Sequence, residues 1–275
     1  MTDRYAVFGN PISHSKSPQI HTAFAENTGQ DLIYEAIAVA EDKFAETVES
    51  FLSGDGQGLN ITIPFKQEAW ALATVRSPRA ELAGAVNTLY RDEQGQLCGD
   101  NTDGVGMVQD IVRNHGGKIE GKRVLILGAG GAVRGVLQPV LEQKPQRLVI
   151  ANRTVSKAVE LAELVAHLGN VSGSGFDTLD GQCFDLIING TAASLQGEVP
   201  PIPASVLADH AWCYDMMYSA SPTAFCQWAL DKGAEKSIDG LGMLVEQAAQ
   251  SFQIWRGIEP DSQSVIKQLR NLLTD

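Results

Sequence analysis

The stretch Arg123-Val-Leu-Ile-Leu-Gly-Ala-Gly-Gly-Ala132 joins an apolar run of strand character directly to a glycine-rich turn. A helical pattern follows the turn, and a second apolar run, Arg147-Leu-Val-Ile-Ala151, comes after the helix. Strand, glycine-rich turn, helix and strand in this order are typical of a βαβ unit in a parallel sheet. This stretch therefore predicts an α/β fold.

Strand and helix patterns continue on both sides of this unit. Short apolar runs ended by turn residues predict strands, and longer stretches with helical periodicity predict helices. Strands are expected at residues 5–8, 32–39, 58–63, 184–188 and 212–215, helices at 18–24, at 43–52, from Pro64 and over a tail at 241–273, and a hairpin at 86–97. A chain of 275 residues, 44% of them hydrophobic, is long enough for two such domains.

Charge and cysteine content argue against several classes of function. The formal net charge of −12 opposes non-specific attraction to nucleic acid or to an anionic membrane surface. The cysteines form no C-x-x-C pair and no histidine cluster has metal-ligand spacing, so no metal site is expected. No stretch has eighteen consecutive apolar residues, and residues 1–5 show no basic stretch followed by an apolar one. We therefore expect a cytoplasmic protein without nucleic-acid or membrane partners.

The glycine-rich turn is the predicted nucleotide site. Gly128-Ala129-Gly130-Gly131-Ala132 lies between an apolar strand and a helix, where glycines let the backbone approach a pyrophosphate at the helix N-terminus. Val133 occupies the third glycine position of the G-x-G-x-x-G pattern, so a plain strand-to-helix turn is the alternative.

The end of the next strand bears on the choice of nucleotide. NAD-binding versions of this unit carry an acidic residue there for the ribose hydroxyls. This chain has Asn152-Arg153-Thr154 instead, followed by Lys157. A carboxylate would repel a 2′-phosphate, whereas Arg153 can bond it with two donors and the other three can add more. NADP is therefore favoured over NAD, unless Arg153 and Lys157 are ordinary solvated residues at a helix start.

Residues 58–66 alternate between apolar and polar side chains before a predicted helix. Asn60 and Thr62 share one face of the strand, which indicates either exposure at a sheet edge or a polar ligand at its C-terminal end. Pro64 suits the first helical position, which puts Lys66 in the first turn. The helix dipole disfavours an ammonium there, so Lys66 either points into water or has a chemical role.

A second polar cluster, Gly99-Asp-Asn-Thr-Asp-Gly104, precedes another helical pattern. Asp103 can simply cap that helix, because aspartate is favoured at N-caps. A calcium loop is excluded because Thr102 and Gly104 fall where ligands would be required.

Five ordered motifs resemble the shikimate dehydrogenase family. They are Asn10-Pro-Ile-Ser-His-Ser-Lys-Ser-Pro18, Asn60-Ile-Thr-Ile-Pro-Phe-Lys66, Gly84-Ala-Val-Asn-Thr88, Gly99-Asp-Asn-Thr-Asp-Gly104 and Asp239-Gly-Leu-Gly-Met243. The resemblance runs nearly end to end, and the set is far more specific than any single motif. It implies an α/β substrate domain of residues 1–102 plus 240–275, an inserted Rossmann-like NADP-binding domain of residues 103–239, and an active site in the cleft between them.

The resemblance also implies a role for individual residues. Lys66 and Asp103 become the catalytic pair of an enzyme that reversibly reduces 3-dehydroshikimate to shikimate with NADPH, a step in aromatic amino-acid biosynthesis. Serines would take the substrate carboxylate, and amides, Thr62 and the catalytic pair its ring hydroxyls. The implied substrate residues are Ser15, Ser17, Asn60, Thr62, Asn87, Tyr218 and Gln247, and Met216, Gly240 and Met243 would pack near the nicotinamide.

Simpler interpretations of these residues remain open. Ser15 and Ser17 can be turn-forming residues, Asn87 a turn or edge residue, and Tyr218 a surface aromatic. Gln247 and Met243 share one face of the predicted C-terminal helix, where a solvated glutamine and a core methionine are the usual finding. Two stretches depart from the family pattern, Arg76-Ser-Pro-Arg79 and Gly190-Thr-Ala-Ala-Ser194.

Two other functions compete with this one. A quinate/shikimate dehydrogenase that prefers NAD shares the fold and the catalytic pair, but Asn152-Arg153-Thr154 speaks against it. A catalytically silent regulator that binds NADPH or shikimate would have no need of Lys66 and Asp103, although the fold alone could not distinguish it from an enzyme. The sequence is compatible with a monomer or a homodimer.

Overall fold

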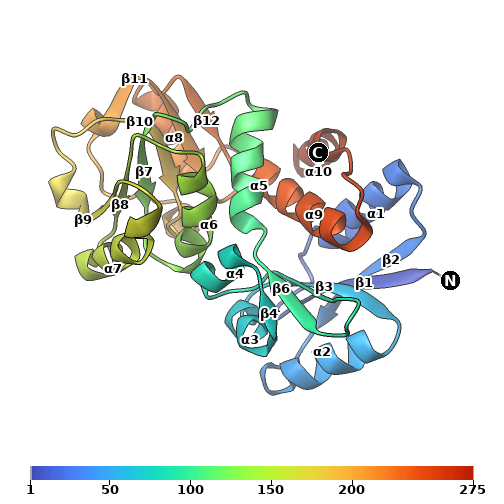
Figure 1. The fold of residues 1–275 in the computed structure, drawn as a ribbon. Coiled ribbons are helices and arrows are strands. Elements are labelled where there is room, and N and C mark those ends of the chain that lie inside the picture. Colours follow the sequence, from blue (N-terminus) through green and yellow to red (C-terminus); the bar gives the residue numbers. More distant parts are fainter. Residues whose placement is uncertain (1, 275) are drawn as a thin grey trace. The chain divides into compact units, whose positions relative to one another are not determined.

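The computed structural model describes residues 2–274, and the chain divides into two compact units. The first unit comprises Met1–Gly106 and Val245–Gln268, and the second comprises Met107–Leu244 and Leu269–Asp275. Each unit contains its own β-sheet with helices packed on it (Figure 1). The predicted α/β fold with parallel-rich sheets is therefore confirmed. No helix within the described residues is long and apolar enough to cross a membrane.

The first unit contains a mixed sheet. Its elements are β1 (Asp3–Gly9), α1 (Ser17–Thr28), β2 (Leu32–Ala38), α2 (Phe44–Ser53), β3 (Gly56–Ile61), α3 (Lys66–Leu72), β4 (Val75–Arg76), α4 (Pro78–Ala83), β5 (Thr88–Arg91), β6 (Leu97–Asp100), α5 (Asp103–Gln109) and α9 (Leu241–Arg256), which begins in the second unit and ends in the first. Within the described residues the strand order is β2-β1-β3-β5-β6-β4. Strands β5 and β6 pair antiparallel, which confirms the predicted hairpin.

Alternation along β1 builds a core on each face of this sheet. Ala6 and Phe8 point to one face, where they pack with Phe44 and other apolar residues of α2. Tyr5 points to the opposite face, where its ring stacks on Trp255 of α9 at a centroid distance of 4.9 Å. Helices α1 and α2 lie on opposite sides of the sheet (Figure 1). The strands are thus held between two apolar layers, and their C-terminal ends carry the polar residues described below.

The second unit contains an all-parallel sheet among the described residues. Its elements are the π-helical turn Asp110–Asn114, β7 (Arg123–Leu127), α6 (Gly131–Glu142), β8 (Arg147–Ala151), α7 (Val155–Val165), β9 (Val171–Ser174), β10 (Phe184–Asn189), β11 (Leu207–Asp215), α8 (Ala224–Asp231), β12 (Lys236–Ile238) and α10 (Ser262–Thr274), which begins in the first unit. The strand order is β12-β11-β10-β7-β8-β9. Counted within this sheet, the order 6-5-4-1-2-3 is that of the dinucleotide-binding doubly wound fold.

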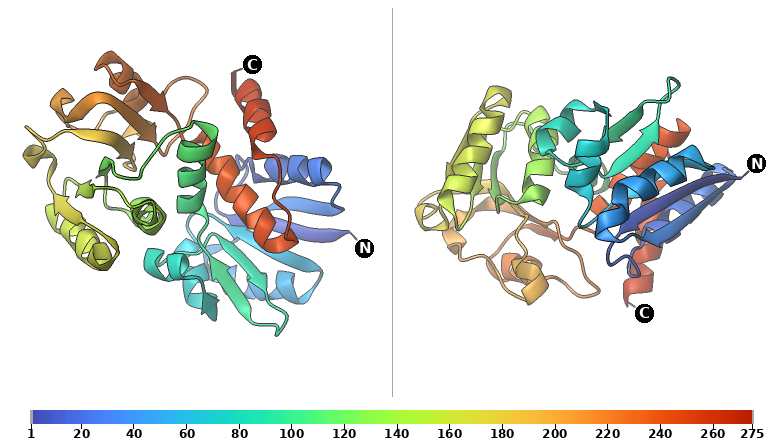
Figure 2. Two further views of the ribbon diagram at one scale, coloured as in Figure 1. Left: turned by 45° about the horizontal axis from the view of Figure 1, so that its top comes forward. Right: turned by 90° about the horizontal axis from the view of Figure 1, so that it is seen from below.

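Helices cover both faces of the second sheet. Helices α6 and α7 lie on one face and α8 on the other (Figure 2). The strands between them are apolar along almost their whole length, and Leu125, Ile187 and Cys213 are fully buried. Near-continuous apolar strands are expected where both faces of a parallel sheet are covered.

Two expectations about element boundaries were wrong. Strand β3 ends at Ile61 rather than at residue 63, and Ile63 is 72% exposed in the turn that follows. Pro64 lies in that turn after a cis peptide bond, so α3 begins at Lys66 and not at the proline. The expected helical tail over 241–273 is confirmed, and it consists of two helices because Gly257 adopts a left-handed conformation (φ 68°) and ends α9.

Candidate active site

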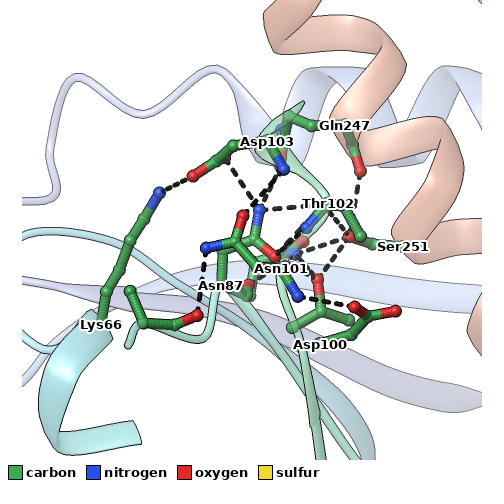
Figure 3. Close-up of polar contacts among 11 residues, drawn as sticks. Lys66, Asn87, Asp100, Asn101, Thr102, Asp103, Gln247 and Ser251 are labelled. Atoms are coloured by element: carbon green, nitrogen blue, oxygen red, sulfur yellow. Dashed lines mark hydrogen bonds and ion pairs between the residues drawn. The ribbon is translucent and has the colours of Figure 1, made fainter. Parts of the chain in front are cut away.

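Lys66 and Asp103 form an ion pair, with Nζ 2.6 Å from Oδ2. The side chains are 30% and 18% exposed, so the pair is partly shielded but reachable from solvent. Lys66 is the first residue of α3, as expected for a residue in the first turn. Its ammonium does not simply point into water, because Asp103 binds it (Figure 3).

Asp103 is placed by the chain that leaves β6. It is the first residue of α5, and its backbone N–H donates to Asn101 Oδ1. Asp100, one residue further back, accepts two hydrogen bonds from the Arg79 guanidinium at 2.6 and 2.7 Å. The stretch 76–79, which the sequence left without interpretation, thus anchors the end of β6. Because the Asp103 carboxylate faces Lys66 and Asn87, helix capping is not the role of its side chain.

Asn87 joins Asp103 to the rest of the polar cluster. Its Nδ2 donates to Asp103 Oδ1 and to Thr102 Oγ1, both at 2.9 Å, and to Gln247 Oε1 at 3.3 Å. Its Oδ1 accepts from the Thr102 backbone N–H at 3.0 Å. Asn87 is buried, so these contacts fix its amide in one orientation. Side chains from the segment after β6, from α5 and from α9 meet around it (Figure 3).

Asn60 occupies the interior strand β3, not a sheet edge, and is only 5% exposed. Its Nδ2 donates to Ser251 Oγ at 3.0 Å and to the Asn87 carbonyl at 3.1 Å. Its Oδ1 accepts from Tyr34 Oη at 2.7 Å and lies 3.2 Å from His21 Nε2. Because the Asn87 carbonyl can only accept, Oδ1 must face His21, and His21 Nε2 therefore carries the proton.

Ser15 and Ser17 of the first motif lie near this network. Ser15 Oγ accepts from the Ser17 backbone N–H at 3.3 Å, and Ser17 is the first residue of α1. The Ser17 hydroxyl hydrogen-bonds to Tyr34, whose pKa is nevertheless raised well above its usual value by burial. Thr62 is half-buried directly after β3 and packs against Gly9, where an added Cβ would lie 2.5 Å from its methyl group. All of these residues belong to the first unit.

The glycine turn follows β7 and opens α6, as expected. Gly128 has a φ of 105°, a conformation that side-chain-bearing residues rarely adopt. Gly130 and Gly131 have open space where a Cβ would stand, and α6 has neither a side-chain cap nor an acidic residue in its first turn. Free backbone donors and open space at a helix N-terminus suit a pyrophosphate, as the turn Gly128-Ala129-Gly130-Gly131-Ala132 predicts.

The residues expected to meet a 2′-phosphate follow β8, the strand next to the glycine turn. Asn152 is half-buried and donates from Nδ2 to the Thr154 carbonyl at 2.9 Å. Arg153, Thr154 and Lys157 are exposed, and Thr154 directly precedes α7. Two cations beside the N-terminus of α7 leave this corner without the acidic residue that would favour NAD.

The residues expected near the nicotinamide lie in the second unit. Met216 follows β11 and is half-buried. Gly240 approaches it so closely that an added Cβ would lie 2.3 Å from the Met216 carbonyl oxygen. Met243 lies on α9, four residues before Gln247 and on the same helix face. Tyr218, half-buried, belongs to the second unit, unlike the other expected substrate residues.

Sequence reasoning missed several residues of this network. Tyr34 and Ser251 each contact Asn60, and His21 stacks on Tyr34 at a centroid distance of 4.1 Å. Ser251 lies one turn after Gln247 on α9, and that spacing was an available signal. Tyr34 lies on β2 and its register position beside Tyr5 of β1 cannot be obtained from local pattern alone.

Comparison with protein families gives three matches along the chain. Residues 7–89 match the shikimate dehydrogenase substrate binding domain, residues 110–196 match shikimate / quinate 5-dehydrogenase, and residues 240–270 match the shikimate 5'-dehydrogenase C-terminal domain. The three matches follow one another in the order of the five motifs and the glycine turn.

Whole-chain comparisons agree with these matches. A curated shikimate dehydrogenase (NADP(+)) of Cellvibrio japonicus is 59% identical over 273 residues, which is 99% of each chain. The crystal structure of an Ael1 enzyme from Pseudomonas putida is 46% identical with a TM-score of 0.93, covering 98% of both chains. The structure of shikimate 5-dehydrogenase from Thermus thermophilus in complex with NADP(H) and shikimate is 30% identical with a TM-score of 0.87, covering 99% of this chain and 100% of that one. The resemblance seen in the motifs is thus confirmed, and this chain belongs to the shikimate dehydrogenase family.

Proposed function

We propose that this protein reduces 3-dehydroshikimate to shikimate with NADPH, and catalyses the reverse oxidation with NADP. Its nearly full-length relative from Cellvibrio japonicus carries this enzyme name. The first unit would bind the substrate, and the second unit, with its doubly wound strand order and glycine turn, would bind the cofactor. The observation that carries the proposal is the ion pair between Lys66 and Asp103 at 2.6 Å.

The pair is suited to acid–base chemistry at a carbonyl oxygen. NADPH would supply the hydride that reduces the ketone. The Lys66 ammonium stabilises the negative charge that develops on the ketone oxygen and donates a proton to it. In the oxidation direction, the neutral amine of Lys66 accepts the proton of the same hydroxyl. Asp103 orients Lys66 through Oδ2, while its Oδ1 is held by Asn87.

Substrate binding would use the polar side chains around this pair. A carboxylate needs hydrogen-bond donors, which the hydroxyls of Ser15 and Ser17 provide at the start of α1. Asn87, Thr62 and Gln247 offer amide and hydroxyl groups for ring hydroxyls. We include Asn60 and Tyr218 in the substrate site on the strength of the motif resemblance.

Cofactor binding would use the corner formed by the ends of β7 and β8. The pyrophosphate would lie on the backbone of residues 128–132, and the 2′-phosphate would lie on Arg153 with Asn152, Thr154 and Lys157. Met216, Gly240 and Met243 would line the nicotinamide end. Arg153 favours this enzyme over the NAD-preferring quinate/shikimate dehydrogenase.

Partners, location and assembly complete the proposal. A net charge of −12 supports a protein without nucleic-acid partners. The proposal also places the enzyme in the cytoplasm, as a monomer or a homodimer. The relatives' names concern a small-molecule substrate, in keeping with this proposal.

One assay distinguishes the proposed function from its competitors. Initial rates are measured by absorbance with shikimate and with quinate, each with NADP and with NAD. We expect turnover with shikimate and NADP to exceed the other three combinations. Comparable rates with quinate and NAD would identify the broader enzyme, and absence of turnover with measurable shikimate affinity would identify the silent regulator.

A further inference from the structure

A fully buried carboxylate lies at the C-terminal end of β11. Asp215 is 0% exposed and no lysine or arginine pairs with it among the described residues. Four donors satisfy it instead. Its Oδ1 accepts from Asn189 Nδ2 and from the Met217 backbone N–H, both at 3.1 Å, and its Oδ2 accepts from the Ser194 and Thr223 hydroxyls, both at 2.6 Å. A carboxylate buried in this way persists only because its donors are fixed in place.

The four donors come from different segments of the second unit. Asn189 ends β10, and Ser194 belongs to the short helical turn Ala193–Gln196 after it. Met217 follows β11, and Thr223 is the N-cap of α8, where its hydroxyl also accepts from the Cys226 N–H. Asp215 thus ties the segments after two neighbouring strands to the start of a helix. The C-terminal ends of these two strands lie on the same side of the parallel sheet as the glycine turn, which follows the C-terminal end of β7.

The segment tied by Asp215 carries Met216. The Met216 N–H donates to the Asn189 carbonyl at 2.9 Å. An added Cβ on Gly190 would lie 3.0 Å from Met216 Sδ, and one on Gly240 would lie 2.3 Å from its carbonyl oxygen. The backbone at Gly190 and at Gly240 therefore lies close against Met216. The next residue, Met217, is held through its N–H by Asp215 itself.

We propose that Asp215 is a positioning residue for the nicotinamide half of NADP, acting through Met216-Met217 and through Ser194. The inference rests on the proposed function, which places Met216 beside the nicotinamide. It also gives a role to Ser194, in the stretch 190–194 that departs from the family pattern. Asp215 does not touch the reacting atoms in this account. It holds the backbone against which the nicotinamide packs.

Asp215→Asn tests this role because it keeps the shape of the side chain and replaces an acceptor oxygen with a donor. The new NH₂ group faces either the two hydroxyls or the Met217 and Asn189 donors, so a buried donor loses its acceptor. We expect the segment carrying Met216 to lose its fixed position. The glycine turn and Arg153, which hold the phosphates, have none of the hydrogen bonds of Asp215 described above.

The experiment compares two ligands by calorimetry. NADP⁺ carries the nicotinamide, whereas adenosine 2′,5′-bisphosphate carries the 2′-phosphate without the nicotinamide. In Asp215→Asn, Kd for NADP⁺ should rise about tenfold, as for one lost hydrogen bond to a charged group, while Kd for the bisphosphate stays within about twofold. Ser194→Ala removes one of the four donors to Asp215. It should raise Kd for NADP⁺ about threefold and leave Kd for the bisphosphate within about twofold.

Asp185→Asn is the matched control. Asp185 lies near the opposite end of β10 and loses an Arg123 ion pair of 2.7 Å when neutralised. This variant should have a lower free energy of unfolding, but Kd for NADP⁺ should not rise more than Kd for the bisphosphate. An equal rise in Kd for both ligands in Asp215→Asn, or no change in either Kd, would overturn the proposal. Should Asp215→Asn not fold, Ser194→Ala decides by the same criterion. Failure of the unmutated protein to oxidise shikimate with NADP would instead refute the proposed function, before any variant is compared.

Discussion

Lys66 Nζ lies 2.6 Å from Asp103 Oδ2 although Lys66 is the first residue of α3, where the positive end of the helix dipole opposes an ammonium. Asp103 supplies the compensating negative charge. Asp103 in turn begins α5, where a carboxylate is favoured. The starts of α3 and α5 therefore carry opposite charges that pair with each other. Lys66, whose charge the helix dipole disfavours, is the residue expected to exchange a proton with the substrate.

Replacing Lys66 by alanine should lower kcat by roughly 10²–10⁴-fold, the usual contribution of general acid–base assistance, while KM for shikimate changes much less. Asp103→Asn should also lose much of kcat, because the neutral amide removes the negative charge that pairs with the ammonium. Steady-state rates of shikimate oxidation measure both effects. Lys43→Ala, which breaks an exposed contact with Glu46, is the control and should leave the rates unchanged. A normal kcat with a raised KM in Lys66→Ala would make Lys66 a binding residue and refute the mechanism.

Arg153→Ala should raise KM for NADP far more than KM for NAD. The exposed guanidinium is the group best suited to two hydrogen bonds with a 2′-phosphate, and NAD has no such group. The ratio of kcat/KM for the two cofactors measures the effect. Arg91→Ala removes a guanidinium paired with Glu49 in the other unit and should not alter the ratio. Equal efficiency with both cofactors in the unmutated enzyme would contradict the role given to Arg153.

Ser15→Ala and Ser17→Ala should each weaken shikimate binding without preventing folding. Each removes one hydroxyl donor for the substrate carboxylate, and a hydrogen bond to a charged group is typically worth about 1.5–3 kcal/mol. Calorimetric titration with shikimate and thermal unfolding measure the two properties separately. Ser13→Ala, exposed in the same segment, is the matched control. Unchanged affinity in both test variants would place the carboxylate elsewhere.

Much of the second unit could be predicted from the sequence. Strands 123–127 and 147–151 were predicted with the bounds that the structure has, because apolar strands buried on both faces end at clear turn residues. The glycine turn was also predicted, since its function is encoded in consecutive residues. The sequence pattern was sufficient to predict an element wherever neighbouring residues determine its structure.

The polar network of the first unit could be predicted only in part. Lys66 and Asp103 were found through motifs, but their contact joins residues far apart in the sequence and depends on the sheet register. Alternation alone left edge exposure open for Asn60, and only the strand order excluded it. Likewise, Pro64 suggested a helix start, yet the chain uses it in the preceding turn. In each case tertiary geometry decided between local alternatives that pattern could not separate.

The hydrogen bond between His21 and Asn60 has a consequence for stability at acid pH. His21 is 1% exposed, and burial lowers its pKa from 6.5 to about 3. Its Nε2 donates to Asn60, while its Nδ1 has no partner among the described residues. The folded protein therefore keeps His21 neutral, although the unfolded chain protonates it below pH 6.5.

Stability should therefore fall as the pH drops below 6.5, and continue to fall until the folded pKa of about 3 is reached, because only the unfolded chain gains the proton. At pH 5, about 1.5 units below the unfolded pKa, His21 alone should lower the free energy of unfolding by about 2 kcal/mol relative to pH 8, at about 1.4 kcal/mol per unit.

His21→Gln keeps a donor for Asn60 but cannot titrate. Urea unfolding at pH 8 and pH 5 measures the loss in each protein, and other titrating groups cancel in the difference between the two losses. The variant should start less stable at pH 8, because glutamine cannot reproduce the stacking on Tyr34, yet lose about 2 kcal/mol less on acidification. Equal losses in both proteins would show that the folded protein also takes up the proton at His21, and the lowered pKa of this buried imidazole would then be wrong.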